Sequence, residues 1–168
     1  MKKVFKRFVG DAPLFLVAMM SVLFFTQCRK HKDENKPDGG ITTSYLVGKK
    51  WQTKAMTVTP GFDDGQGGTI TDLYAIMPAC VKDNFTIFKA DGSAVEDEGA
   101  DKCPGTNQTR TYTWKLKDDG TLEGFTMEDF TGTFKSVKNS DTKVTITATG
   151  KMADDNTVRT LTIVIEAI

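Results

Sequence analysis

Hydrophobic and polar residues alternate along most of the chain after residue 41, a pattern typical of half-buried β-strands. Between residues 111 and 116, Tyr112 and Trp114 alternate with threonines, and the stretch 144–149 reads VTITAT. Short turn sequences separate these stretches, and two of them contain an Asp-Gly pair, which supplies the positive φ that tight hairpin turns need. The pattern therefore predicts an all-β chain of short antiparallel strands.

The alternating stretches predict eight strands joined mostly by short turns. Consecutive antiparallel strands of this kind favour an up-and-down meander, and closing the meander into a barrel protects its edges. We therefore expect an all-β fold, a small eight-stranded antiparallel up-and-down barrel. The expected strands are 50–59, 84–90, 93–98, 109–117, 121–127, 130–138, 142–149 and 157–167.

The segment 60–79 interrupts the alternation. It begins with the sequence GFDDGQGG, which predicts a flexible loop. A short helix is then expected, because Asp72 can cap its first turn and Pro78 would end it.

A different apolar pattern lies at the start of the chain. Basic residues within 1–11 precede an apolar run of 14 residues, Ala12 to Phe25. A helix that crosses a membrane needs about 20 apolar residues, so the run is too short for one and matches a secretory signal peptide. The residue that soon follows, Cys28, resembles the lipobox cysteine of bacterial lipoproteins, which becomes the lipidated N-terminus. The alternatives are an ordinary cleaved signal with an incidental cysteine and a retained anchor.

These features divide the chain into three parts. We expect a lipoprotein signal peptide over 1–27, a disordered tether over 28–41 and the barrel domain over 42–168. Residues 29–40 contain no apolar residue and cannot bury enough surface to become ordered. The expected location is the bacterial cell envelope, with the protein lipid-anchored to the outer membrane on its periplasmic or cell-surface side.

Three cysteines are present, and acylation of Cys28 would leave Cys80 and Cys103 as one pair. Disulfides persist in an exported protein, so we expect these two cysteines to form one. Two free buried thiols are the alternative. A metal site is disfavoured, because there is no C-x-x-C spacing and no partner histidine.

Charge and the scarcity of histidine exclude several classes of function. The whole chain has 22 basic and 22 acidic residues; without residues 1–27 the counts are 18 and 21, with no basic patch. Nucleic-acid binding is therefore disfavoured. The single histidine, His31, lies in the tether, so the barrel can hold neither a Ser-His-Asp triad nor a His-ligated metal. We expect no enzymatic activity, no metal and no cofactor.

Five short motifs, listed below in chain order, together resemble those of lipocalin-like domain lipoproteins common in Bacteroidota. The resemblance covers about residues 42–168. It implies a small eight-stranded barrel or barrel-like sheet on a lipid anchor, and no settled ligand. The motifs are Gly-Lys-Lys-Trp at 48–51, Cys80-Val-Lys-Asp83-Asn84, Phe88-Lys-Ala-Asp91-Gly92, Glu98-Gly99-Ala-Asp-Lys-Cys103 and Tyr112-Thr-Trp114.

Counting positions in steps of two assigns a set of bulky side chains to the barrel interior. An eight-stranded barrel is just wide enough either to be filled by its own side chains or to hold one small ligand. The interior candidates are Trp51, Phe85, Ile87, Tyr112, Trp114, Leu122, Phe134, Ile146, Leu161 and Ile163. Of these, the candidates for ligand contact are Trp51, Phe85, Tyr112, Trp114 and Phe134, and core packing is the alternative for each.

The function that follows is that of a lipid-anchored, non-enzymatic barrel that binds a small apolar or amphiphilic ligand. The alternative is a filled barrel that acts as a structural or interaction module and binds a protein or glycan partner at the cell envelope. A cavity in the barrel would favour the first function, and a solid interior with an exposed apolar patch would favour the second.

Overall fold

A computed structural model describes residues 40–125, 127, 130–152 and 155–168. All of them belong to one compact unit, Glu34–Ile168. The signal peptide, Cys28 and the tether up to residue 39 lie outside the described residues, so the expectations for them stay predictions.

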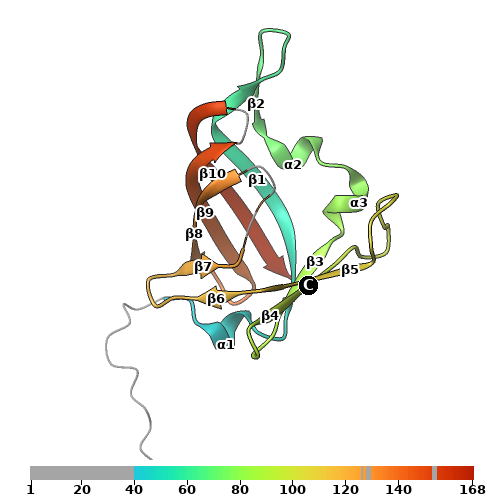
Figure 1. The fold of residues 1–168 in the computed structure, drawn as a ribbon, viewed down its shortest axis with the longest axis vertical. Helices are drawn as coiled ribbons and strands as arrows, with labels where there is room; N and C mark the ends of the chain where they lie inside the picture. Colours follow the sequence, from blue (N-terminus) through green and yellow to red (C-terminus); the bar gives the residue numbers. More distant parts are fainter. Residues whose placement is uncertain (1–39, 126, 128–129, 153–154) are drawn as a thin grey trace, which may run out of the picture. The chain divides into compact units, whose positions relative to one another are not determined.

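The described part of the chain folds into one antiparallel sheet with three short helices (Figure 1). Going across the sheet, the strands follow the order β5-β4-β3-β1-β10-β9-β8-β7-β6, and β2 pairs separately with β1. The elements are α1 (Thr43–Leu46), β1 (Lys50–Asp63), β2 (Thr69–Asp72), α2 (Leu73–Ile76), α3 (Ala79–Lys82), β3 (Phe85–Phe88), β4 (Ser93–Asp97), β5 (Thr109–Thr113), β6 (Lys115–Leu116), β7 (Thr121–Glu123), β8 (Phe130–Lys138), β9 (Lys143–Met152) and β10 (Asp155–Ala167).

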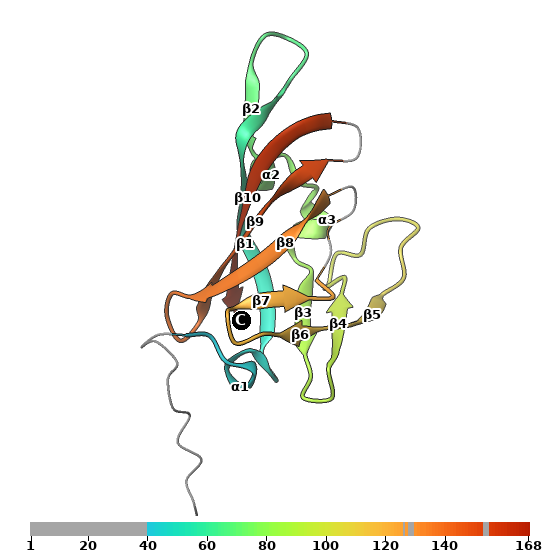
Figure 2. The ribbon, with the colours of Figure 1, turned by 60° about the vertical axis from the view of Figure 1, so that its left-hand side comes forward.

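The two ends of this sheet are one stretch of chain. β5 and β6 stand at opposite ends of the strand order, yet only Trp114 separates them in sequence. The stretch 109–116 therefore pairs with β4 through its first half and with β7 through its second half, which nearly closes the sheet into a barrel (Figure 2). With β5 and β6 taken as one strand and β2 as a branch, the described residues form eight strands in up-and-down order. This confirms the expected fold, which is the strand arrangement of lipocalin barrels.

The segment after residue 60 differs from the expected loop. β1 continues to Asp63 and forms a hairpin with β2, in which Phe62 pairs with Ile70. Figure 1 shows this hairpin extending past the neighbouring strands. The expected flexible loop is reduced to the hairpin turn, because the Asp64 carboxylate accepts backbone N–H groups from Gln66 and Gly68, both at 2.8 Å.

The short helix is confirmed at α2. The Asp72 side chain accepts the N–H of Ala75 at 2.9 Å, and the helix ends at Ile76. A further turn of helix, α3, follows at Ala79–Lys82.

The barrel core agrees with the period-two counting except in β3. There, Thr86 pairs with the inward-facing Trp51, so Thr86 and Phe88 face the interior and the expected assignment of Phe85 and Ile87 is wrong by one residue. Tyr112 is half-buried and packs against the core. The remaining expected interior residues are all buried: Trp51, Trp114, Leu122, Phe134, Ile146, Leu161 and Ile163.

Candidate functional site

A cavity of about 630 Å³ lies in the barrel, next to the buried core. Strands β1, β3, β4, β5 and β10 form its walls, the segment of α2 and α3 contributes Met77 and Val81, and the loop after β7 contributes Phe125 and Met127. Among the described residues, the lining consists of Trp51, Thr53, Met56, Met77, Val81, Asn84, Phe85, Thr86, Phe88, Glu96, Arg110, Thr111, Tyr112, Gly124, Phe125, Met127, Ile163 and Ile165.

One wall of the cavity is apolar. Met56 of β1 pairs with Ile163 of β10, and Ile165 faces the same side because side chains alternate along a strand. The ring of Phe125 joins this apolar surface and meets the ring of Phe134 edge-on, with centroids 5.1 Å apart. This wall can bury the hydrocarbon part of a ligand.

The opposite wall carries a row of polar side chains. Thr86 pairs with Glu96, and Glu96 pairs with Arg110, so the three residues form one row across β3, β4 and β5. Arg110 donates from Nε (3.2 Å) and from Nη2 (2.6 Å), both to Oε2 of Glu96. The Arg110 side chain is 75% exposed and that of Glu96 is 27% exposed. The Glu96 carboxylate therefore forms part of the cavity wall, whereas the Arg110 guanidinium is mostly exposed to solvent.

Tyr112 lies one row deeper than this polar row, opposite Ala94. Burial raises the pKa of its phenol, the hydrogen bond with Thr86 lowers the pKa and the nearby Glu96 raises it; the net shift is upward. The phenol therefore stays protonated near neutral pH and can donate a hydrogen bond in the cavity.

One end of the barrel is closed by α1. The indole of Trp51 donates from Nε1 to the backbone oxygen of Leu46 at 2.8 Å, and both side chains are almost fully buried. The ring of Tyr45 lies 5.5 Å from that of Trp51. Trp51 thus forms part of the cavity lining and also packs against the helix that covers this end.

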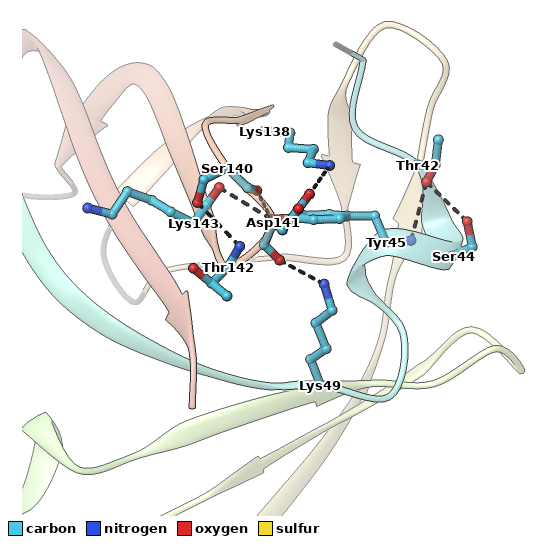
Figure 3. Close-up of polar contacts among 9 residues, drawn as sticks. All are labelled: Thr42, Ser44, Tyr45, Lys49, Lys138, Ser140, Asp141, Thr142 and Lys143. Atoms are coloured by element: carbon cyan, nitrogen blue, oxygen red, sulfur yellow. Dashed lines mark hydrogen bonds and ion pairs between the residues drawn. The ribbon is translucent and has the colours of Figure 1, made fainter.

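Polar contacts fasten α1 to the turn between β8 and β9 (Figure 3). The Tyr45 hydroxyl donates to the backbone oxygen of Ser140 at 2.6 Å, and Lys49 donates to that of Asp141 at 3.1 Å. Lys138 pairs with the Asp141 carboxylate at 2.8 Å. Because α1 is fixed in this way, a ligand has to reach the cavity from elsewhere, and the exposed Arg110 and Thr111 mark a solvent-facing side of the lining.

The expected disulfide is present and braces the cavity rim. Cys80 and Cys103 are bonded, which joins α3 to the loop after β4. In the same region the Asp83 carboxylate accepts the N–H groups of Ala100 and Asp101, both at 2.8 Å. These contacts hold the segment that supplies Val81 and Asn84 to the cavity.

The structure separates the five expected ligand-contacting residues into two groups. Trp51, Phe85 and Tyr112 are among the residues at the cavity, but Phe85 lies on the outer strand face, where its ring packs under the Lys50 ammonium, 4.3 Å from the ring centroid. Trp114 and Phe134 are only 5% and 3% exposed and belong to the core beside the cavity. No ligand contact tests any of these assignments, so as a ligand site they stay predictions.

Glu96 and Arg110 were not among the expected site residues. Both lie in alternating strands, where a charged side chain normally faces solvent. The Asp91-Gly92 turn is the sequence feature that could have shown that Glu96 faces the interior. A tight hairpin at this turn places Glu96 opposite Thr86, and Thr86 lies on the same face as Trp51.

Within the described residues, no group of three or more His, Cys, Asp or Glu side chains is arranged to hold a metal ion. The same part of the chain contains no helix that is both long enough and apolar enough to span a membrane.

No protein-family model matches the sequence, and no curated protein matches it. Among solved structures the chain is similar to "Odorant Binding Protein OBP1", with a TM-score of 0.41 and 14% identity over 76% of this chain and 74% of that one. It is also similar to bovine odorant binding protein in complex with undecanal, with a TM-score of 0.41 and 15% identity over 79% and 77%. Likenesses of 14% and 15% identity do not establish a family for this chain.

Proposed function

We propose that this barrel binds one small apolar or amphiphilic molecule in its cavity and performs no chemistry on it. The observation that carries this proposal is a cavity of about 630 Å³ with an apolar wall and a few polar groups opposite. Small-molecule sites typically have volumes of about 300–1,000 Å³, are mostly apolar and hold a few oriented polar groups. The cavity of this chain fits that description in both volume and lining.

Uptake of a neutral, environment-sensitive dye such as N-phenylnaphthylamine tests the proposal. Thr53 lines the cavity, so Thr53→Phe should fill part of it and weaken dye binding. Thr57 is exposed on the same strand, where it pairs with Thr162, so Thr57→Phe is the matched control and should bind dye like the wild type. Absence of dye uptake by the wild-type protein would contradict ligand binding and favour the alternative, a filled barrel that binds a protein or glycan partner.

We further propose that Cys28 is acylated and anchors the protein in the bacterial cell envelope, at the outer membrane. The short apolar run before Cys28 and the polar tether after it support this proposal, as does a disulfide, which persists in exported proteins. Stable attachment needs two acyl chains or one chain with a second signal. Cys28→Ser should therefore not label with a palmitate analogue and should leave the membrane fraction. Unchanged membrane association of that variant would refute the anchor.

A further inference from the structure

We propose that the cavity selects amphiphiles whose polar end donates hydrogen bonds and carries no negative charge, such as long-chain alcohols and amines. Glu96 is the residue that makes this selection, and fatty carboxylates are the class that it disfavours. This inference rests on the proposed binding function.

The polar groups of the cavity are gathered on one wall. Thr86, Glu96 and Arg110 form a single row across three strands, and Met56, Ile163 and Ile165 face the cavity from β1 and β10. An amphiphile in this space lowers its free energy by placing its hydrocarbon chain on the apolar wall and its polar end at the row. The row therefore meets the head group of the ligand.

Glu96 offers this head group an acceptor. Arg110 donates two hydrogen bonds to Oε2 of Glu96, and among the described residues no hydrogen bond reaches Oε1. An ionised carboxylate accepts hydrogen bonds and donates none. A hydroxyl or ammonium group can therefore bind at Oε1 while the Glu96–Arg110 pair stays intact.

A negatively charged head group is repelled by Glu96 at the same place. The ionisable groups that line the cavity in the described part of the chain are Glu96, Arg110 and Tyr112, and Glu96 is the more buried member of the ion pair. A fatty carboxylate would have to compete with Glu96 for Arg110 at a site where water screens charge less than it does in bulk solvent. Repulsion from Glu96 then weakens its binding.

The experiment compares ligands that share one hydrocarbon chain and differ only in the head group. Decanol, decylamine and decanoate would each displace N-phenylnaphthylamine from the full-length protein near neutral pH. We expect decanoate to bind about tenfold more weakly than decanol, the size of effect that one lost or repelled polar contact produces.

Removing the Glu96 charge should abolish this tenfold difference. In Glu96→Gln the carboxylate that repels decanoate is gone, so decanoate should gain about tenfold relative to decanol and bind about as tightly as decanol does. Glu96→Asp keeps the charge and should keep the wild-type order. The matched control is Glu166→Gln, which removes the carboxylate of a surface ion pair with Lys143 outside the cavity lining and should change nothing.

The outcomes separate this inference from the binding function itself. Equal displacement of the dye from the wild type by all three compounds would contradict the selectivity, and so would an undiminished tenfold difference in Glu96→Gln. Either result leaves the binding function itself supported. Failure of both the dye and decanol to bind refutes the binding function. If Glu96→Gln does not fold, Arg110→Gln decides instead, because it leaves the Glu96 charge without this partner and should weaken decanoate binding further.

Discussion

At the scale of single residues, the two tryptophans are held by hydrogen bonds as well as by packing. Trp114 donates from Nε1 to the backbone oxygens of Ser93 (3.0 Å) and Lys89 (3.2 Å), both in the β3–β4 hairpin. Its ring lies 4.6 Å from that of Phe88. Trp114 therefore fixes the hairpin to the strand that closes the barrel, which is a structural role.

Trp114→Ala should lower the free energy of unfolding by about 3–5 kcal/mol, the cost of removing a large buried aromatic side chain. Dye affinity per folded molecule should be unchanged, because Trp114 does not line the cavity. Urea unfolding and dye titration together measure the two effects. Tyr112→Ala provides the contrast: this half-buried residue faces the cavity, so dye affinity should fall with a smaller loss of stability. A stable Trp114→Ala variant that cannot bind dye would place Trp114 in the ligand site.

The sequence identifies aromatic residues as site candidates because they are bulky and recur at inward positions. It does not distinguish an aromatic side chain in the core from one at a cavity, since both are buried and apolar. Tyr112 and Trp114 show this, because they lie two positions apart on one strand face and only Tyr112 reaches the cavity. The difference arises from what packs across the barrel, which local alternation does not encode.

At the scale of elements, the Cys80–Cys103 disulfide joins α3 to the loop after β4 across a hairpin of two strands. Replacing both cysteines by alanine should lower the free energy of unfolding by about 2–4 kcal/mol, because the unfolded chain regains the freedom of the closed loop. Urea unfolding of the variant and of the oxidised wild type measures the difference. Reduction of the wild type should give the same loss, and equal stability of all three samples would contradict the prediction.

Aspartates close several of the turns between strands. The Asp91 carboxylate accepts the N–H of Ser93 at 2.8 Å, and that of Asp119 accepts the N–H of Thr121 at 3.0 Å. Hydrogen bonds from Thr121, together with Lys135, lower the pKa of Asp119 from 3.8 to about 2. Each turn is thus favoured by the ionised form of its aspartate.

The low pKa of Asp119 makes stability depend on pH in a defined window. Because the folded state holds this pKa below its unfolded value, the contribution of Asp119 is complete above pH 3.8 and is lost as the pH falls towards about 2. Asp119→Asn should therefore reduce the acid-induced drop in melting temperature between about pH 4 and 2. Asp118→Asn changes the neighbouring exposed aspartate of the same turn and serves as the control. Identical pH profiles for the wild type and Asp119→Asn would contradict the prediction.

Most strands could be predicted from the sequence because alternation and turn residues agree, as they do around Val144 to Ala148. The four residues of β3 were assigned to the wrong faces because both faces of the sequence Phe-Thr-Ile-Phe carry apolar side chains. Pairing of Thr86 with Glu96 and Trp51 decides the register. The β1–β2 hairpin was missed because its glycines and aspartates predict a loop and indicate little about how far the flanking strands extend.

At the scale of the whole molecule, the barrel depends on one close approach between β7 and the stretch 109–116. β7 pairs with β6 through only two residue pairs, Lys115 with Glu123 and Leu116 with Leu122. Gly124 follows directly with φ of +77°, and a Cβ there would collide with the backbone oxygen of Thr113. A side chain at this position would push apart the strands that close the barrel.

Gly124→Ala should therefore destabilise the protein by more than the cost of positive φ alone, which is about 1–3 kcal/mol. Gly105→Ala is the matched control, because Gly105 has φ of +83° and no atom within 4 Å of an added Cβ. Thermal melting should place Gly124→Ala below Gly105→Ala, with both below the wild type. Equal melting temperatures for the two variants would mean that the approach at Thr113 does not limit closure.

Closure also joins the first strand of the barrel to the last, since β1 pairs with β10 from Trp51 and Ala167 to Thr59 and Thr160. A chain made from its N-terminus therefore exposes the apolar face of β1 before its main partner exists, and synthesis at about 5–20 residues per second separates the two strands by seconds. Pairings between such distant segments also form late in folding, because the long intervening loop must be ordered first. For a chain that is exported as we propose, this order of events has a use. A chain exported in this way would remain unfolded until its last strand is available on the far side of the membrane.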